Sequence, residues 1–205
     1  MVVVGWLKTW AIRINVDLTP IKNMPTSIYF LPGHGGRISN GLGQALMSRG
    51  FDVVGRETLG YFKNLDFDPQ VETVAQDLKA NFWHADARVV ANSYGGYLLL
   101  QALSLSEPYP GKLLLLSPIV GEFSSEQIRM GFIPPYAKRL YELANKGLFP
   151  LPVSCEIHVG SEDWQSIPDN VTAFASFVNA QVTVVQGAGH SLPKEYVSSV
   201  LDRWL

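Results

Sequence analysis

Ala91-Asn92-Ser93-Tyr94-Gly95-Gly96 is the stretch that decides the fold of this chain. The residues before it, 87–90, are mostly apolar and β-branched and predict a buried strand. The residues after it, 97–103, are apolar and unbranched and predict a buried helix. A serine at such a junction, with small residues two places before and two places after it, fits a sharp turn that holds its hydroxyl beside a helix N-terminus. On its own the stretch fits an ordinary turn as well as a nucleophile.

Composition limits the class of protein. A chain of 205 residues suits one compact domain, here 1–205, with a sizeable core. It is 47% hydrophobic and 17% charged, which favours a buried sheet and an apolar pocket. The net charge is −2 and the basic residues do not cluster, so we expect neither nucleic acid nor a membrane as partner. The single cysteine, Cys155, excludes an intrachain disulfide and lies in an apolar run typical of a buried thiol.

Targeting and cofactor signals are missing from the sequence. Residues 1–8 are apolar but lack the basic start and small-residue cleavage site of a signal peptide, and no run is long enough to span a membrane. We therefore expect a cytoplasmic protein. Histidines and carboxylates show no metal-ligand spacing, and no Gly-Lys-Ser/Thr follows the glycines of 33–43. We expect no metal and no other cofactor; the oligomeric state cannot be predicted.

Strand and helix patterns alternate along most of the chain. Residues 10–18 alternate apolar and polar, which predicts a half-buried edge strand within the N-terminal segment 1–25. Asp68 and Pro69 predict the N-cap and first residue of a helix. Strands that alternate with helices indicate an α/β fold with a mainly parallel central sheet covered on both faces. The predicted buried strands are 27–31, 51–54, 87–90, 112–118, 155–159 and 181–185.

The segment 119–152 interrupts this rhythm. It is longer than a crossover helix requires, and it contains several prolines and a possible helix over 136–146. We interpret it as a short lid insertion over one end of the sheet. Its many apolar side chains either pack it onto the body of the protein or line a pocket above Ser93 that favours an apolar acyl or alcohol group.

Four candidate groups follow predicted strands: the Gly33–Gly36 loop, Ser93, Asp163 and His190. In parallel sheets, binding and catalysis gather at the carboxyl ends of the strands. A serine needs a base within hydrogen-bond reach to become a nucleophile, and histidine suits that task near neutral pH. A carboxylate can orient the imidazole, and backbone N–H groups can stabilise a developing oxyanion.

These motifs resemble the α/β-hydrolase family, over about residues 27–205. The elbow resembles the family's Gly-x-Ser-x-Gly, and His34-Gly35-Gly36 resembles its oxyanion loop. The family's catalytic acid ends a strand in a Gly-x-x-Asp motif, which Gly160-Ser161-Glu162-Asp163 resembles. Its histidine follows a strand in a Gly-x-Gly-His motif, which Gly187-Ala188-Gly189-His190 resembles, and the order serine, acid, histidine is the family's order. The resemblance implies a three-layer fold, with Ser93 as nucleophile, Asp163 as acid and His190 as base. It also implies an oxyanion hole formed by the N–H groups of Gly36 and Tyr94.

The sequence departs from the family pattern at two places. Ala91 replaces the first elbow glycine, which the steric requirement tolerates, and Pro168 falls one residue later than the proline that often follows the acid. Glu162 is the nearest rival of Asp163 as the acid, whereas Asp169 suits the start of the next helix.

The other histidines have simpler interpretations. His34 would shape its loop, His158 lies in the middle of a predicted strand and is expected in the core, and His84 follows a predicted helix and is expected at the surface. Trp164, beside the proposed acid, fits either the core or a pocket.

Three functional hypotheses follow. The first is a serine hydrolase that cleaves a small, partly apolar carboxylic ester or thioester through an acyl-enzyme. The second is another reaction of the same family, such as perhydrolysis, amide cleavage or C–C bond hydrolysis. The third is a non-catalytic binding protein that keeps the fold.

Overall fold

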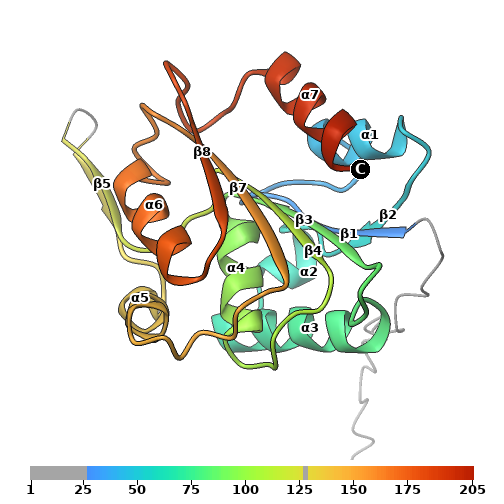
Figure 1. The fold of residues 1–205 in the computed structure, drawn as a ribbon, viewed down its shortest axis with the longest axis horizontal. Helices are drawn as coiled ribbons and strands as arrows, with labels where there is room; N and C mark the ends of the chain where they lie inside the picture. Colours follow the sequence, from blue (N-terminus) through green and yellow to red (C-terminus); the bar gives the residue numbers. More distant parts are fainter. Residues whose placement is uncertain (1–26, 127–128) are drawn as a thin grey trace, which may run out of the picture.

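The central layer is a parallel sheet of six strands in the order β2-β1-β3-β4-β7-β8. A computed structural model describes residues 27–126 and 129–205 (Figure 1). All neighbouring strands of this sheet pair in parallel, as the alternating pattern predicted. The edge strand predicted over 10–18, with the rest of 1–25, lies outside the described residues. The strands are β1 (Ser27–Leu31), β2 (Asp52–Gly55), β3 (Arg88–Asn92), β4 (Lys112–Leu116), β7 (Ser154–Gly160) and β8 (Gln181–Val185).

Helices cover both faces of the sheet, as Figure 1 shows. One face carries α1 and α7, whose buried side chains join the smaller of two hydrophobic clusters. The larger cluster includes side chains of α3, α4 and α6 on the other face. No described helix combines the length and apolar character needed to cross a membrane. The helices are α1 (Gly41–Met47), α2 (Gly60–Lys63), α3 (Phe67–Asn81), α4 (Tyr94–Leu103), α5 (Ala137–Asn145), α6 (Pro168–Phe177) and α7 (Lys194–Trp204).

The central strands are apolar on both sides because both sides are buried. In β3, Val89 packs into the larger cluster and Val90 into the smaller one. In β4, Leu113 and Leu115 face the larger cluster while Leu114 faces the smaller one. This alternation explains why these strands appear in the sequence as continuous apolar runs, as is usual in parallel sheets.

Helix α3 begins earlier than the sequence predicted. Asp66 takes the N-cap position and Phe67 is the first helical residue, so Asp68 is inside the helix and Pro69 is its third residue. Proline is tolerated there because the first N–H groups of a helix have no partner within the helix. A proline in the first turn therefore does not fix the exact start of a helix.

The strand order places the candidate loops together. β1 pairs with β2 on one side and with β3 on the other. Successive strands are therefore added first on one side of β1 and then on the opposite side, so the strand order reverses at β1. A reversal of this kind leaves a crevice outside the carboxyl ends of the two central strands. The loop after β1 and the turn after β3 both border that crevice.

The insertion forms a small unit beside the sheet. A two-stranded antiparallel hairpin, β5 (Phe123–Ser125) and β6 (Met130–Phe132), is followed by α5, which matches the helix expected there to within a residue at each end. In Figure 1 this unit lies on the side of α6, away from α1 and α7. Phe123, Leu140 and Phe149 pack into the larger cluster, so part of its apolar content attaches it to the body.

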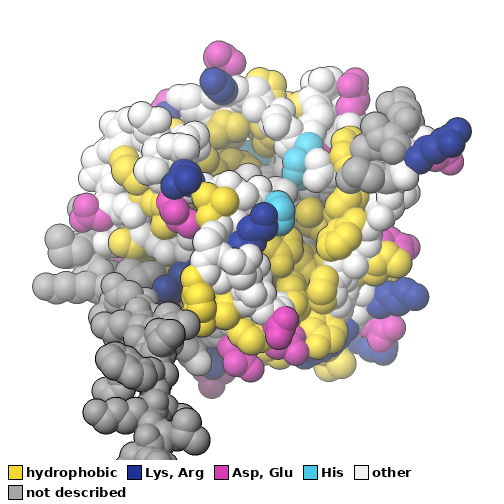
Figure 2. Space-filling model, turned by 180° about the vertical axis from the view of Figure 1, so that it is seen from behind, with side chains coloured by type: hydrophobic (Ala, Val, Ile, Leu, Met, Phe, Trp, Pro, Cys, Tyr) yellow, Lys and Arg dark blue, Asp and Glu magenta, His cyan; other side chains and the backbone are white. Residues whose placement is uncertain are grey.

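The surface is mixed in character. Figure 2 shows basic side chains dispersed among acidic, polar and hydrophobic ones on one face of the molecule. Several large apolar side chains of the insertion are exposed, including Ile133 and Leu148.

Candidate active site

Ser93 sits at the turn between β3 and α4 in an unusual backbone conformation. Its φ is 52° and its ψ is −123°, outside the regions that most L-residues adopt. The turn is possible because two glycines allow close contact. A Cβ on Gly95 would lie 2.3 Å from the carbonyl oxygen of Leu31, and one on Gly33 would lie 3.1 Å from Cβ of Ser93. The strained turn is thus held by the end of β1, as the small residues of the elbow predicted.

Ser93, His190 and Asp163 form a continuous line of hydrogen bonds. Ser93 Oγ lies 2.8 Å from Nε2 of His190, and Nδ1 of His190 lies 2.9 Å from Oδ2 of Asp163. An ionised carboxylate can only accept, so Nδ1 carries a hydrogen and donates to Asp163. Nε2 then has a free lone pair and accepts from the Ser93 hydroxyl. The three side chains come from the loops after β3, β7 and β8.

Asp163 is fixed by backbone donors. Its side chain is fully buried, and Oδ1 accepts hydrogen bonds from the N–H groups of Gln165 at 2.9 Å and Ser166 at 2.8 Å. The rival carboxylate, Glu162, is exposed, and Asp169 lies in the first turn of α6. Of these three carboxylates, only Asp163 forms a hydrogen bond with His190 in the described part of the chain.

The loops that carry Asp163 and His190 are joined to each other. The N–H of Glu162 donates to the carbonyl of Ala188 at 2.9 Å, and the N–H of Gly187 donates to Oγ of Ser161 at 2.9 Å. A Cβ on Gly160 would lie 2.1 Å from the carbonyl oxygen of Ala188, so the loops approach as closely as glycine allows. The separation of Asp163 and His190 is therefore set by backbone contacts.

The N–H of Gly36 already has two acceptors. It donates to the carbonyl of Gly33 at 2.9 Å and to Oγ1 of Thr58 at 2.9 Å. That Gly36 supplies an oxyanion donor stays a prediction, which these hydrogen bonds do not support. The N–H of Gly33 donates to Oδ1 of Asn92 at 3.1 Å, and that of Gly35 donates to the carbonyl of Thr58 at 3.2 Å. Within this loop only the N–H of His34 has no acceptor among the described residues.

Tyr94 keeps a free backbone donor. It is the first residue of α4, so its N–H has no acceptor within the helix, and none is seen elsewhere in the described ranges. The sequence analysis did not single out Thr58 or Asn92, which together hold the loop after β1. Thr58 also donates its hydroxyl hydrogen to the carbonyl of Gly33. The only sequence signal for Asn92 was its place beside Ser93.

The fold can be compared with known proteins at this point. No protein-family model matches the sequence, and no curated protein matches it. Solved structures do resemble it. A lipase-esterase related protein from Clostridium acetobutylicum has a TM-score of 0.64 at 11% identity, covering 91% of this chain and 97% of that one. A monoacylglycerol lipase from Paleococcus ferrophilus has a TM-score of 0.60 at 11% identity, covering 89% and 95%.

A third similar structure is described as an alpha/beta hydrolase enzyme, from a sediment metagenome of the Mar Chica lagoon in Morocco. Its TM-score is 0.58 at 16% identity, covering 89% of this chain and 91% of that one. This chain has the α/β-hydrolase fold. At such low identity the likeness shows the fold alone, so the reaction has to be inferred from the site.

The α/β-hydrolase fold here holds a cleft of about 900 Å³ beside Ser93. Its walls come from the loop after β1, the elbow, the segment after His190, and helices α1 and α7. No residue of 119–152 lines this cleft. The insertion therefore does not form the walls of the cleft beside Ser93. The lining residues are Gly33, His34, Gly41, Leu42, Gln44, Ala45, Arg49, Asn92, Ser93, Leu116, Ser117, Gln165, His190, Ser191, Leu192, Lys194, Val197 and Ser198.

The other histidines and the cysteine have different surroundings: His34 lines the cleft beside Ser93, whereas His158, His84 and Cys155 do not. His158 is buried in β7, where burial lowers its pKa, and His84 is exposed, as expected. The ring of His34 meets the ring of Tyr94 edge-on at 6.0 Å. Cys155 is a buried free thiol whose pKa is raised to about 12 by burial, so it is a poor nucleophile. Within the described ranges, no group of three His, Cys, Asp or Glu residues could hold a metal ion.

Proposed function

We propose that this protein is a serine hydrolase that cleaves carboxylic esters or thioesters through an acyl-enzyme. The observation that carries the proposal is the continuous line from Ser93 Oγ through the His190 ring to the Asp163 carboxylate. A structural serine does not need a base at 2.8 Å whose other nitrogen meets a fully buried carboxylate. The strained turn at Ser93 supports the same proposal, since backbone strain concentrates at functional sites.

In the first step Ser93 Oγ attacks the carbonyl carbon while Nε2 of His190 takes the hydroxyl proton. The carbonyl oxygen becomes negative in the tetrahedral intermediate. We assign its stabilisation to the N–H groups of Tyr94 and His34, which have no other acceptor among the described residues. Each such donor lowers the barrier by about 3–4 kcal/mol in enzymes where it has been removed.

In the second step the intermediate collapses and the leaving oxygen or sulfur takes the proton from His190. The acyl group then remains on Ser93. A water molecule, deprotonated by His190, attacks the acyl-enzyme, and the acid leaves as Ser93 recovers its proton. Asp163 keeps the imidazole in the tautomer with hydrogen on Nδ1 and stabilises the imidazolium that forms in each step. The backbone donors to Asp163 hold its carboxylate in position for that purpose.

The test compares Ser93→Ala with Ser191→Ala, a serine that lines the same cleft and whose hydroxyl makes no hydrogen bond to His190 in the described part of the chain. Ser93→Ala should lower kcat for short p-nitrophenyl esters by at least about 10⁴-fold, because the nucleophile is lost. It should also abolish covalent labelling by a fluorophosphonate probe. Ser191→Ala should keep both hydrolysis and labelling. Undiminished labelling of Ser93→Ala would overturn the assignment of the nucleophile.

A further inference from the structure

The cleft beside Ser93 continues between two helices. Helix α1 follows the loop after β1, and α7 follows His190, so both begin near Ser93 and run away from it along the sheet. At about 900 Å³ the cleft has the size of a small-molecule site. It therefore offers space for one part of a substrate whose carbonyl lies at Ser93.

Apolar side chains line both sides of this α1–α7 cleft, among polar ones such as Gln44 and Ser198. Leu42 and Ala45 line it from α1, while Leu192 and Val197 line it from the other side. All four side chains are half-buried and pack against the smaller hydrophobic cluster. An apolar chain between the helices would cover surface that is still partly open to water, which is favourable in proportion to the apolar area covered.

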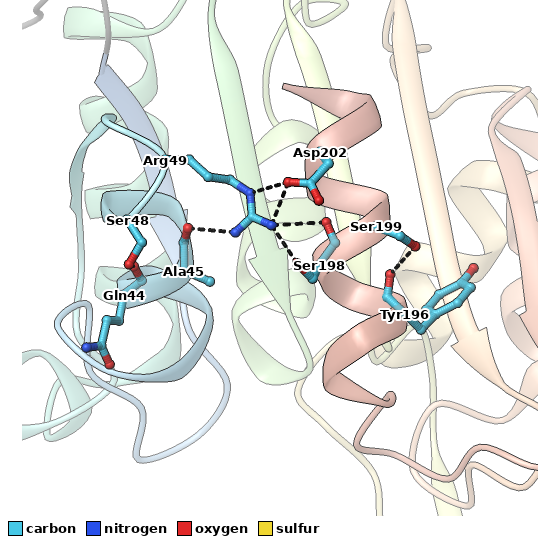
Figure 3. Close-up of polar contacts among 8 residues, drawn as sticks. All are labelled: Gln44, Ala45, Ser48, Arg49, Tyr196, Ser198, Ser199 and Asp202. Atoms are coloured by element: carbon cyan, nitrogen blue, oxygen red, sulfur yellow. Dashed lines mark hydrogen bonds and ion pairs between the residues drawn. The ribbon is translucent and has the colours of Figure 1, made fainter.

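Arg49 bridges the two helices, as Figure 3 shows. Its guanidinium donates to the carbonyl of Ala45 at 2.9 Å on α1. It also donates to Oγ of Ser198 at 2.7 Å, to the carbonyl of Ser198 at 3.1 Å and to Oδ1 of Asp202 at 2.8 Å on α7. Ser198 lies four residues after Lys194, so the bridge lies about 6 Å along α7 from its first residue.

Arg49 is suited to stop a chain rather than to bind an anion. Its charge is paired with Asp202, and its donors are directed at α1 and α7. The other cation of the lining, Lys194, is exposed at the first residue of α7. The bridge thus places an ion pair and polar groups across the path of an apolar chain, which would have to displace them to go further.

We infer that the α1–α7 cleft binds an unbranched apolar chain of the substrate and that the Arg49 bridge limits the length of that chain. The inference rests on the proposed function, since Ser93 places the carbonyl. The same apolar chemistry can come from the acyl part or from the alcohol part of an ester. The protein should accordingly prefer short to medium chains on one side of the ester bond.

The test measures kcat/KM for two series of substrates. One series is p-nitrophenyl esters of straight-chain acids of increasing length, and the other is acetates of straight-chain alcohols. In one series kcat/KM should rise by up to about fourfold per methylene. The value of kcat/KM should stop rising when the chain reaches Arg49, and the chain length at which this happens is the break. The series that shows this break identifies which part of the ester occupies the cleft.

Three variants locate the break. Arg49→Ala should move it to longer chains, because the bridge is removed. Val197→Phe should move it to shorter chains by filling the cleft, and it keeps the inference testable if Arg49→Ala does not fold. Arg203→Ala is the matched control: this arginine of α7 pairs with Glu156 and does not line the cleft, so the break should stay in place. A break that no cleft variant moves would overturn the inference while leaving Ser93-dependent hydrolysis intact.

A binding measurement separates this inference from the proposed function. Calorimetry on Ser93→Ala with straight-chain carboxylic acids and alcohols needs no catalysis. Affinity should rise with chain length up to the same break, and the break should move in Ser93→Ala/Arg49→Ala. If binding behaves so while the protein with Ser93 intact hydrolyses no ester, the proposed function fails and the role of the cleft stands. Affinity that does not depend on chain length would refute the role of the cleft.

Discussion

At the scale of single residues, the site depends on contacts that Ser93 makes with the end of β1. A non-glycine residue at φ 52° and ψ −123° is strained. Such strain costs on the order of 1–3 kcal/mol and persists only when the surroundings impose it. Gly33 and Gly95 allow that surrounding backbone to come close enough. The Ser93 hydroxyl is therefore positioned by the packing of two loops and not by the conformational preference of the residue itself.

Thr58 holds the loop that carries the proposed donor of His34. It accepts from the N–H of Gly36 and donates to the carbonyl of Gly33, and it is buried. Thr58→Val should lower kcat by about 10–100-fold, because the His34 N–H would no longer be held toward the oxyanion. KM should change less than kcat, since Thr58 itself does not line the cleft.

Steady-state kinetics on an ester with the optimal chain length measures this effect. Thr58→Ser keeps a hydroxyl and should restore most of kcat. If Thr58→Val and Thr58→Ser were equally impaired, the hydroxyl would not be the group that matters. The assignment of His34 as a donor would then lose its support.

The site residues differ in how far the sequence could predict them. Ser93, Asp163 and His190 each directly follow a buried strand, and the structure brings them into hydrogen-bond contact; their catalytic roles stay proposals. The sequence could not show that the N–H of Gly36 donates to Thr58, which lies in the loop after a different strand. No spacing within the loop itself shows which of its donors is already used.

At the scale of elements, β7 and α7 are tied by a buried polar cluster. Nε2 of His158 lies 2.8 Å from Glu156, and Nδ1 lies 2.7 Å from the hydroxyl of Tyr196. Arg203 of α7 pairs with Glu156 as well. Burial lowers the pKa of His158, against the raising effect of Glu156. Burial alone would raise the pKa of Glu156, but hydrogen bonds from Arg203 and His158 lower it overall.

These shifts predict how stability depends on pH. The ordinary pKa of histidine is about 6.5, and below this pH His158 binds a proton more readily in the unfolded chain than in the folded protein. The free energy of unfolding therefore falls as the pH decreases from about 6.5 toward the lowered pKa of His158. The effect is about 1.4 kcal/mol for each unit of pKa difference. Glu156 contributes only below about 4.5. His158→Gln should flatten the dependence between pH 5 and 7, measured by urea unfolding at several pH values.

An unchanged slope in His158→Gln would mean that other groups control this range. The variant is expected to be less stable at pH 7 as well, since Glu156 and Tyr196 lose an optimally placed partner. The change in slope, rather than the loss of stability, is what identifies the titration of His158.

Sequence patterns located the elements better than their ends. The run 27–31 matched β1 because strands buried on both faces are read directly from apolar residues. Helix α3 started two residues before the Asp68–Pro69 signal predicted, because proline fits several positions of a first turn. The cleft could not be predicted at all. It depends on how far apart α1 and α7 dock, and these helices are far apart in the sequence.

At the scale of the whole molecule, the two faces of the sheet are packed unequally. The layer of α1 and α7 rests on the smaller cluster, and the layer of α3, α4 and α6 on the larger one. Every residue of α4 after Tyr94 is buried, whereas α1 buries only Gly43 and Leu46. Regions with fewer buried apolar contacts open at lower free energy. The α1–α7 layer should therefore be the first part of the described structure to open.

Amide hydrogen exchange followed by mass spectrometry tests this order. Peptides from α1 and α7 should exchange faster than peptides from α4, and Arg49→Ala should speed exchange in α1 and α7 without affecting α4. Equal protection of both layers would show that the sheet and its helices open as one unit. Acceleration throughout the protein in Arg49→Ala would lead to the same conclusion.

The unequal layers have an evolutionary consequence. The walls of the α1–α7 cleft are half-buried side chains over the smaller cluster, whereas Ser93 and Asp163 are fixed by strands and loops packed into the core. Substitutions in the walls, such as those at Leu42 or Val197, can thus alter which molecules fit while leaving the reactive groups in place. A lineage of such proteins can exchange one substrate for another through a few tolerated replacements, and its members would share a reaction long after they had ceased to share a substrate.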